Sequence, residues 1–536
     1  MGSKGRFYGH MTSLNPEVTG SLHFATVNYP DGRQTNFIVD CGLYQERAYN
    51  VLNHKKFPFK EENVDFALIT HNHADHMGRL PYLVAGGFKG SIYASSETVR
   101  LMDISLADSF RIEKEDSRNC NRAPMYDGID FENTLNQRVS CEFGETVYVD
   151  RNIKVTFFMN GHLLGAAMIL VQISYPGEKD INLLFTGDYK PQNVFFHVEE
   201  LPEWVRELPL TIVTESTYGY MDTTEVSYHM EDDLEKAIQE GKTVMITVFA
   251  QERAQMIMDM LKNMQKFGKI NTKIPIRLDG NLAQEYTRAY KNSKFLIESG
   301  KDDFFPENFS FISKENRLEV LGDGRQQIVL TTSGMADHGP AKLYLERWVG
   351  RKDVLIYIPG YTSPDTLGYE LQHPVDERLI KATRKGVKLT PEQKLQISES
   401  EVLNPKVFIN GHWLDMRAQV LTTSECSSHG KADEIIAFLQ GFKHLNMVLI
   451  NHGQTEVKQQ FAECVGIETD AKHVGILGAH TFKISCYGYV KHMGAKLVFP
   501  DMESPKLVKA KRKEEKKNAK KQKRFNLPFV RKNYRR

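Results

Sequence analysis

Short apolar runs broken by turns make up most of the first 200 residues. Three of these runs, at residues 37–39, 66–70 and 181–185, lead directly into segments rich in histidine or aspartate. Apolar runs of this length, bounded by turns, predict buried strands. Since open α/β sheets place their sites at the carboxyl ends of strands, we expect the segments after these runs to lie together.

From about residue 209 the pattern changes to alternating strands and helices. A β-branched strand is predicted at 243–249, followed by an amphipathic helix at 252–264 with apolar residues at helical spacing. Further strands are predicted at 274–278, 327–331 and 354–358, and a helix at 282–290. Such alternation is typical of a parallel sheet covered by helices.

Strand-like runs return at 407–409 and 448–451, after a charged segment at 376–401 that predicts a helical excursion. The chain therefore leaves a first domain, builds an inserted one and comes back. Its length of 536 residues also requires two or three separate cores.

The composition is that of an ordinary globular protein, with 41% hydrophobic and 26% charged residues. The six cysteines form no CxxC pair, which argues against a disulfide framework and favours a reducing compartment. We recognise no signal peptide and no apolar run of about 18 residues, so no membrane association is expected. We therefore expect a cytoplasmic protein, or a nuclear one if the source is a eukaryote.

The charge is distributed unevenly along the chain. Residues 506–536 contain 15 Lys and Arg and two Glu, whereas the whole chain has a net charge of +1. The low complexity of residues 504–536 predicts a disordered basic tail. One interpretation is a solvated tail without a partner. The others are contact with a polyanion, such as RNA or a ribosome, and a localisation signal.

Four potential metal ligands, His71, His73, Asp75 and His76, fall within six residues directly after a predicted buried strand. Imidazole suits zinc and similar metals, and a carboxylate adds charge that helps to hold a second ion. If the chain stays extended, His71 and His73 point the same way, and Asp75 and His76 can turn toward the second ion. Chance clustering of surface histidines is the weaker interpretation.

A two-metal site needs further ligands from elsewhere in the chain. His162 follows a predicted strand at 155–158, Asp188 lies in a Thr-Gly-Asp turn, and His452 ends the strand at 448–451. Alone, each of these is more often a loop histidine or a turn-forming aspartate. Their joint position at strand ends favours a shared site.

Together with Asp40, these residues form an array that resembles the metallo-β-lactamase fold. Within that fold the chain is similar to the β-CASP nucleases, which include ribonuclease J and the endonuclease of mRNA cleavage and polyadenylation. Three further motifs carry this resemblance: Thr-Glu-Ser-Thr-Tyr-Gly at 214–219 with Glu215, Ser-Ser-His at 427–429 with His429, and Asn-His-Gly at 451–453 with His452. The resemblance spans roughly residues 5–500.

The resemblance implies an α/β protein, a metallo-β-lactamase αββα sandwich with an inserted α/β β-CASP domain. We expect the first part of the sandwich at 1–208, the β-CASP domain at 209–402 and the second part of the sandwich at 403–503. The inserted domain should cover the metal site and form one wall of a cleft. Such a cleft does not easily admit a duplex, so the expected substrate is single-stranded.

The resemblance also implies a role for each site residue. Two Zn²⁺ ions are expected, the first on His71, His73 and His162, the second on Asp75, His76 and His452, with Asp188 bridging both. His429 is the expected general acid, with Glu215 holding its tautomer. Asp75 also counts among the catalytic residues, and Asp40 is expected to orient the ligand loop.

We therefore predict a zinc-dependent ribonuclease that hydrolyses phosphodiester bonds of single-stranded RNA in RNA processing or decay. His452 favours RNA, because DNA-processing relatives tend to have Val at this position. Two alternatives stay open, a catalytically weak RNA-binding or scaffold subunit and a metallo-hydrolase of small esters or thioesters. Endonuclease versus 5′-exonuclease action is also open, and a homodimer is a further expectation.

Overall fold

The structure, a computed structural model, describes residues 9–14, 17–46, 49–177, 179–360, 362, 366–384, 402, 404–477, 481–484 and 492–493. The predicted basic tail lies outside these residues, and the charged segment at 376–401 is described as a helix only up to residue 384. Within the described part of the chain, no helix has the length and apolar character that a membrane span requires. The five described cysteines are free.

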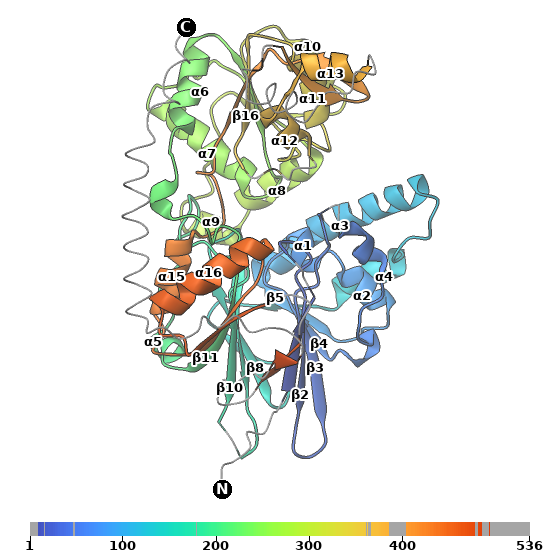
Figure 1. Cartoon of the computed structure of the whole chain (residues 1–536), viewed down its shortest axis with the longest axis vertical. Coiled ribbons are helices and arrows are strands. Elements are labelled where there is room, and N and C mark those ends of the chain that lie inside the picture. Colours follow the sequence, from blue (N-terminus) through green and yellow to red (C-terminus); the bar gives the residue numbers. More distant parts are fainter. Residues whose placement is uncertain are drawn as a thin grey trace.

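Two large sheets pack against each other in the lower half of the molecule (Figure 1). The eight-stranded sheet has the order β24-β23-β1-β2-β3-β4-β5-β6 and the seven-stranded sheet the order β22-β21-β11-β10-β9-β8-β7. Phe37 and Phe66 of the first sheet and Phe157 and Phe185 of the second belong to one buried cluster, so the core lies between the sheets.

The strands of the eight-stranded sheet are β1 (Gly9–Ser13), β2 (His23–Asn28), β3 (Gln34–Val39), β4 (Phe66–Leu68), β5 (Ser91–Ser95), β6 (Arg138–Cys141), β23 (Thr481–Ile484) and β24 (His492–Met493). Those of the seven-stranded sheet are β7 (Thr146–Tyr148), β8 (Ile153–Met159), β9 (Ala167–Ile173), β10 (Ile181–Phe185), β11 (Pro209–Thr214), β21 (His444–Ile450) and β22 (His473–Ile476).

Helices cover the outer face of each large sheet. Ile38 and Ala67 of the eight-stranded sheet pack with Leu83 from the helical layer that contains α2 (Leu80–Ala85), α3 (Ser96–Asn119) and α4 (Gly128–Asn136). Leu184 of the seven-stranded sheet packs with Leu439 of α15 (Ala432–Gln440) and with residues of α16 (Thr455–Glu468). This four-layer arrangement confirms the predicted αββα sandwich.

A third, all-parallel sheet forms the upper half of the molecule, with the order β14-β13-β15-β12-β16-β20 (Figure 1). We call this sheet and the helices packed on it the six-stranded domain. Helices α6, α7 and α8 contribute to the core on one face, and α10, α11 and α12 to the core on the other. The predicted parallel sheet covered by helices is therefore confirmed.

The strands of this domain are β12 (Thr243–Thr247), β13 (Ile276–Asp279), β14 (Phe309–Ile312), β15 (Ile328–Thr331), β16 (Val354–Ile358) and β20 (Gln419–Thr422). Its helices are α6 (Met230–Gln239), α7 (Arg253–Lys266), α8 (Asn281–Lys291), α9 (Lys294–Glu298), α10 (Arg317–Gly322), α11 (Ala341–Trp348) and α12 (Leu367–Gln372). A small sheet beside it contains β17 (Val375–Asp376), β18 (Pro405–Ile409) and β19 (His412–Asp415). The described residues also form α1 (Ala74–Met77), α5 (Glu203–Arg206), α13 (Glu377–Arg384) and three short 3-10 helices at Asn50–His54, Glu61–Asn63 and Thr223–Glu225.

The expected boundaries at 208/209 and 402/403 would place β11 in the inserted domain and β20 in the sandwich. The structure has the reverse. β11 pairs with β10 and β21 in the seven-stranded sheet, and β20 pairs with β16 in the six-stranded domain. We propose that the chain crosses between the two halves at 215–229 and again at 423–431. The Glu425 carboxylate joins these segments, since it accepts hydrogen bonds of 2.9 Å from the backbone N–H groups of His229 and Met230.

Candidate metal centre

The histidine-rich motif begins where β4 ends. The chain leaves β4 through Thr70, and His71 and His76 are both buried. The Asp40 carboxylate accepts hydrogen bonds from the Thr70 backbone N–H at 2.8 Å and from the Thr70 hydroxyl, and it lies 2.8 Å from Nδ1 of His76. Asp40 therefore contacts the loop that the family resemblance implies it orients, and that role stays a prediction.

Gly42 allows the Asp40 turn to approach α1. A Cβ atom at this position would lie only 1.6 Å from the carbonyl oxygen of Asp75. The flanking residues use this closeness, since the N–H of Cys41 donates to the His76 carbonyl at 2.6 Å and the N–H of Leu43 to the Ala74 carbonyl at 2.9 Å. Glycine is therefore required at position 42 if the turn is to form these hydrogen bonds with the histidine-rich motif.

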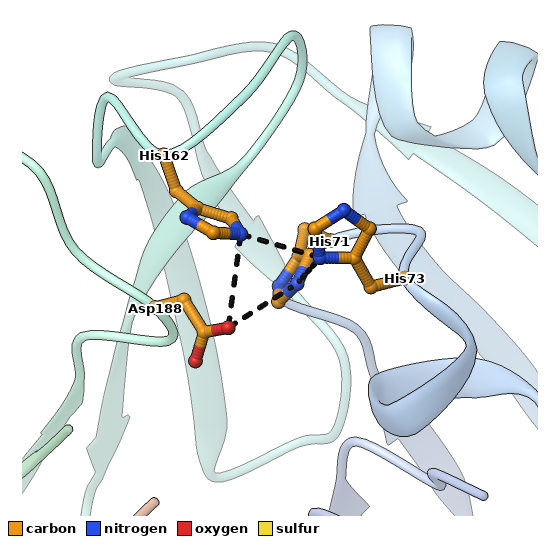
Figure 2. A group of neighbouring side chains, drawn as sticks. All are labelled: His71, His73, His162 and Asp188. Atoms are coloured by element: carbon orange, nitrogen blue, oxygen red, sulfur yellow. Dashed lines mark hydrogen bonds and ion pairs between the residues drawn. The ribbon is translucent and has the colours of Figure 1, made fainter. Parts of the chain in front are cut away.

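Three strand ends bring the first group of side chains together (Figure 2). Nδ1 of His73 lies 3.1 Å from Nε2 of His71 and 3.3 Å from Nε2 of His162. Oδ2 of Asp188 lies 3.7 Å from Nε2 of both His71 and His162. Four potential donor atoms thus point at one small volume.

A second group shares Asp188 with the first. Nε2 of His76 lies 3.4 Å from Oδ2 of Asp188 and 3.4 Å from Nε2 of His452. Nε2 of His452 lies 3.5 Å from the other oxygen of Asp188 and 3.6 Å from Oδ2 of Asp75. The structure therefore brings all seven predicted ligand residues into two adjoining groups, although their role as ligands stays a prediction.

The outward-facing nitrogens of four imidazoles have partners of their own. His76 contacts Asp40 as described above, and Nδ1 of His162 lies 2.8 Å from the Ser428 carbonyl oxygen. Hydroxyl groups serve the other two rings: Thr70 Oγ1 lies 3.1 Å from His71 Nδ1 and Thr217 Oγ1 lies 2.9 Å from His452 Nδ1. Such contacts fix the ring orientation and direct Nε2 of each ring toward the centre.

Of these orienting partners, Asp40 alone was assigned such a role from the sequence. Thr70 directly precedes the histidine-rich motif and Thr217 lies within the motif at 214–219. Closeness to these motifs was the one feature of the sequence that could have pointed to either residue. The Ser428 carbonyl is a backbone group and leaves no signal in the sequence. His23 was also missed; it is buried on β2, and burial, with nearby His76 and His452, lowers its pKa to about 3.

The electrostatics of the cluster fit bound cations. Burial lowers the pKa of His71 and of His162 well below the usual range, so both rings offer lone pairs at neutral pH. Burial also opposes charge on His76, but Asp188 and Asp40 raise its pKa well above the usual value. Oδ1 of Asp188 is buried and has no hydrogen-bond partner among the described residues. An unpartnered buried carboxylate oxygen among converging imidazoles suits a divalent metal ion.

His429 and Glu215 adjoin the cluster, and potential donor atoms of both lie within 4.8 Å of those of Asp188 and His452. Nδ1 of His429 is 2.9 Å from Oε2 of Glu215, whose other oxygen accepts a 2.5 Å hydrogen bond from the Tyr189 backbone N–H. The Glu215 side chain is 1% exposed, whereas that of His429 is 19% exposed. The His429 ring lies 4.8 Å from the His162 ring and 5.8 Å from the His452 ring, centre to centre. The His429 ring therefore lies between the solvent and the candidate metal centre.

Three family profiles match the chain. They are the metallo-β-lactamase superfamily at residues 26–155, the Beta-Casp domain at 254–371 and the Zn-dependent metallo-hydrolase RNA specificity domain at 413–476. With the αββα sandwich and the His/Asp cluster, these matches show that the chain belongs to the metallo-β-lactamase superfamily. Within that superfamily it belongs to the β-CASP family.

Curated relatives include proteins from archaea and a bacterium. The chain is 28% identical to the transcription termination factor FttA of Methanocaldococcus jannaschii over 460 residues, 82% of this chain and 66% of that protein. It is also 28% identical to a ribonuclease of Thermus thermophilus over 454 residues, 82% of this chain and 91% of that protein. For FttA of Methanococcus maripaludis the identity is 28%, over 83% of this chain and 66% of that protein. The chain thus spans just under two thirds of the length of these FttA proteins.

We expect the purified protein to contain two equivalents of divalent metal by elemental analysis, and His452→Ala to reduce that content. The physical reason is that Nε2 of His452 lies within 3.6 Å of oxygens of both Asp75 and Asp188. His229→Ala is the matched control, because His229 pairs with Asp233 on α6 outside both groups. An unchanged metal content in His452→Ala would contradict the assignment of His452 as a ligand.

Proposed function

We propose that this chain is a zinc-dependent ribonuclease that hydrolyses phosphodiester bonds of single-stranded RNA. The observation that carries the proposal is the combination of a His/Asp cluster suited to two cations with the His429–Glu215 pair beside it. The match to an RNA specificity domain and the similarity to a ribonuclease support the choice of RNA.

The donor set supports zinc in particular. Imidazole-rich sites completed by carboxylates suit zinc better than magnesium or calcium, which prefer oxygen ligands. One ion would be held by His71, His73 and His162, the other by Asp75, His76 and His452, with Asp188 shared between them. When bound, a pair of such ions supplies Lewis-acid activation of water and neutralises charge on the phosphate.

His429 is proposed to protonate the leaving oxygen. Glu215 accepts from Nδ1 of His429, so the proton available for transfer is the one on Nε2. Because the Tyr189 N–H holds the other oxygen of Glu215, the carboxylate stays in place and fixes the orientation of the imidazole. The partial exposure of His429 leaves the ring accessible to a substrate.

Other predicted partners belong to the same proposal. Residues 506–536 would contact RNA or a ribosome through their 15 basic side chains. Homodimer formation also stays a prediction, which light scattering of the purified chain would test. Cytoplasmic or nuclear placement stays a prediction, to be tested by imaging the tagged full chain.

We expect labelled single-stranded RNA to be cleaved by the protein and to survive when a chelator is present. Asp75→Ala combined with His76→Ala should abolish cleavage, because these side chains are proposed to hold one of the two ions. Asp233→Ala combined with His229→Ala removes the same side-chain types from the first turn of α6 and the residue before it, and should retain activity. Circular dichroism establishes whether each variant is folded.

Unchanged RNA cleavage in the folded Asp75/His76 variant would contradict the proposed site. Metal-free protein that binds RNA without cutting it would instead favour a scaffold subunit. Metal-loaded protein that hydrolyses esters but not RNA would favour a small-molecule hydrolase. A circular RNA among the substrates separates endonuclease from 5′-exonuclease action, since it has no 5′ end.

We expect His429→Ala to slow RNA cleavage by about 10²–10⁴-fold, the usual contribution of a general acid. The metal content should be unchanged, since His429 is not among the proposed ligands. An RNA with sulfur in place of the leaving oxygen needs no protonation, so the loss should be much smaller on that substrate. An equal loss on both substrates would contradict the role as an acid.

We expect removal of residues 506–536 to weaken RNA binding and to make its dependence on salt concentration shallower. Each Lys or Arg that contacts a phosphate releases counterions, so fewer contacts reduce the slope of log affinity against log salt. Filter binding at several salt concentrations measures that slope. An unchanged slope would favour a solvated tail without a partner.

A further inference from the structure

The six-stranded domain contacts the histidine-rich loop through a buried amide pair. Asn72 stands between His71 and His73, and Gln251 stands between β12 and α7. Nδ2 of Asn72 donates to Oε1 of Gln251 at 2.9 Å, and Nε2 of Gln251 donates back to Oδ1 of Asn72 at 3.0 Å. Two hydroxyl groups also accept from the Asn72 amide, that of Tyr286 on α8 at 3.1 Å and that of Ser105 on α3 at 3.2 Å.

The same region also holds the loop that carries His162. The Leu164 backbone N–H donates to the Tyr290 hydroxyl at 3.2 Å, and this hydroxyl donates to Glu252 at 2.7 Å. Nδ2 of Asn193 donates both to the Gly161 carbonyl, at 2.8 Å, and to the other carboxylate oxygen of Glu252, at 3.0 Å. Two segments of the αββα sandwich that carry candidate ligands are therefore held by neighbouring residues of the six-stranded domain.

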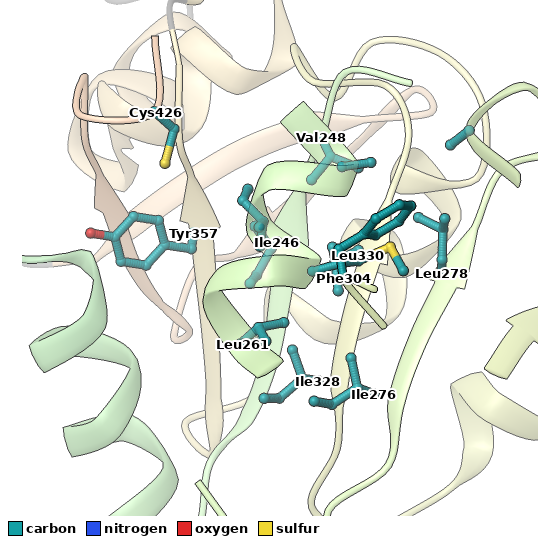
Figure 3. Close-up of a cluster of buried hydrophobic side chains, with 14 of the residues drawn as sticks. Ile246, Val248, Leu261, Ile276, Leu278, Phe304, Ile328, Leu330, Tyr357 and Cys426 are labelled. Carbon is teal, nitrogen blue, oxygen red and sulfur yellow. The ribbon is translucent and has the colours of Figure 1, made fainter. Parts of the chain in front are cut away.

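The residues that make these contacts are supported by a close-packed core. Figure 3 shows α7 packed on the six-stranded sheet, with Leu261 over Ile246 and Ile328. The same buried cluster continues into the sandwich, where it includes Leu101 and Leu164. Because close-packed interiors resist deformation, the start of α7 cannot shift without disturbing this shared core.

We propose that Gln251 is a positioning residue for the metal centre. Through its paired amide it holds Asn72, and thereby fixes the directions in which His71 and His73 present their ring nitrogens. The proposal rests on the proposed function, in that it assumes these histidines bind zinc. Metal retention then depends on contact between the two halves of the molecule, although none of the seven candidate ligands belongs to the six-stranded domain.

The test is the zinc affinity of Gln251→Met, measured by competition with a chromophoric chelator. Methionine keeps nearly the same length and volume but offers Asn72 no amide partner. We expect the affinity to fall by about 10-fold, the lower end of what is seen when groups supporting metal ligands are removed. The melting temperature of the zinc-free protein reports any general loss of stability separately.

Gln255→Met is the matched control. Gln255 is buried on α7, and its amide donates to the Thr287 hydroxyl of α8 at 2.8 Å and to the Ala250 carbonyl at 3.2 Å, both within the six-stranded domain. This substitution likewise removes the hydrogen bonds of a buried side-chain amide, but it leaves the contact between Gln251 and Asn72 in place. Its zinc affinity should match that of the unmodified protein.

A swapped pair, Asn72→Gln with Gln251→Asn, keeps two facing amides of the same combined length and should recover most of the lost affinity. Equal zinc affinities for Gln251→Met and the unmodified protein would overturn the proposal, as would equal losses in Gln251→Met and Gln255→Met. Failure of the unmodified protein to bind zinc would be a different result, because it would refute the proposed function itself.

Discussion

The carboxylate of Asp188 is the point on which the candidate metal centre depends. Its oxygens lie within 3.7 Å of ring nitrogens from four histidines, and one of the two is buried without a hydrogen-bond partner among the described residues. Burying a carboxylate in this way is costly unless a cation compensates it. The rest of the sandwich can be understood as the framework that brings these rings to Asp188 from separate strand ends.

That framework has several levels of support. Asp40, Thr217 and the Ser428 carbonyl engage the outward nitrogens of ligand rings, so the ring orientations do not depend on a metal alone. Behind them, the glycine at position 42 lets two backbone segments touch. In addition, Gln251 and Tyr286 of the six-stranded domain form hydrogen bonds with Asn72 of the histidine-rich loop. Preorganisation of this kind is what a two-metal hydrolase requires, since small displacements of ligands alter metal affinity and reactivity.

Local pattern was enough to predict several strands of both halves and the helices α7 and α8, but not the long helix α3. The apolar run at 181–185 coincides with β10, and the helix predicted at 252–264 lies within one or two residues of α7. The histidine-rich motif, the strand ends and the family resemblance together pointed to Asp188 and to the six other candidate ligands that the structure places near it. The strand and helix predictions succeeded because each depends on short-range periodicity, whereas the ligand roles of the seven site residues stay a prediction.

Long-range pairing was the part that the sequence could not supply. β11 and β20 are short strands whose place in one sheet or another follows only from their hydrogen-bonding partners. The contact between Asn72 and Gln251 joins positions 179 residues apart, and neither amide has a distinctive local context. The most direct test of the central claim is anomalous X-ray diffraction at the zinc absorption edge, on crystals of the zinc-loaded protein. The account predicts two peaks that flank the Asp188 carboxylate, and a map without any peak beside Asp188 would contradict it.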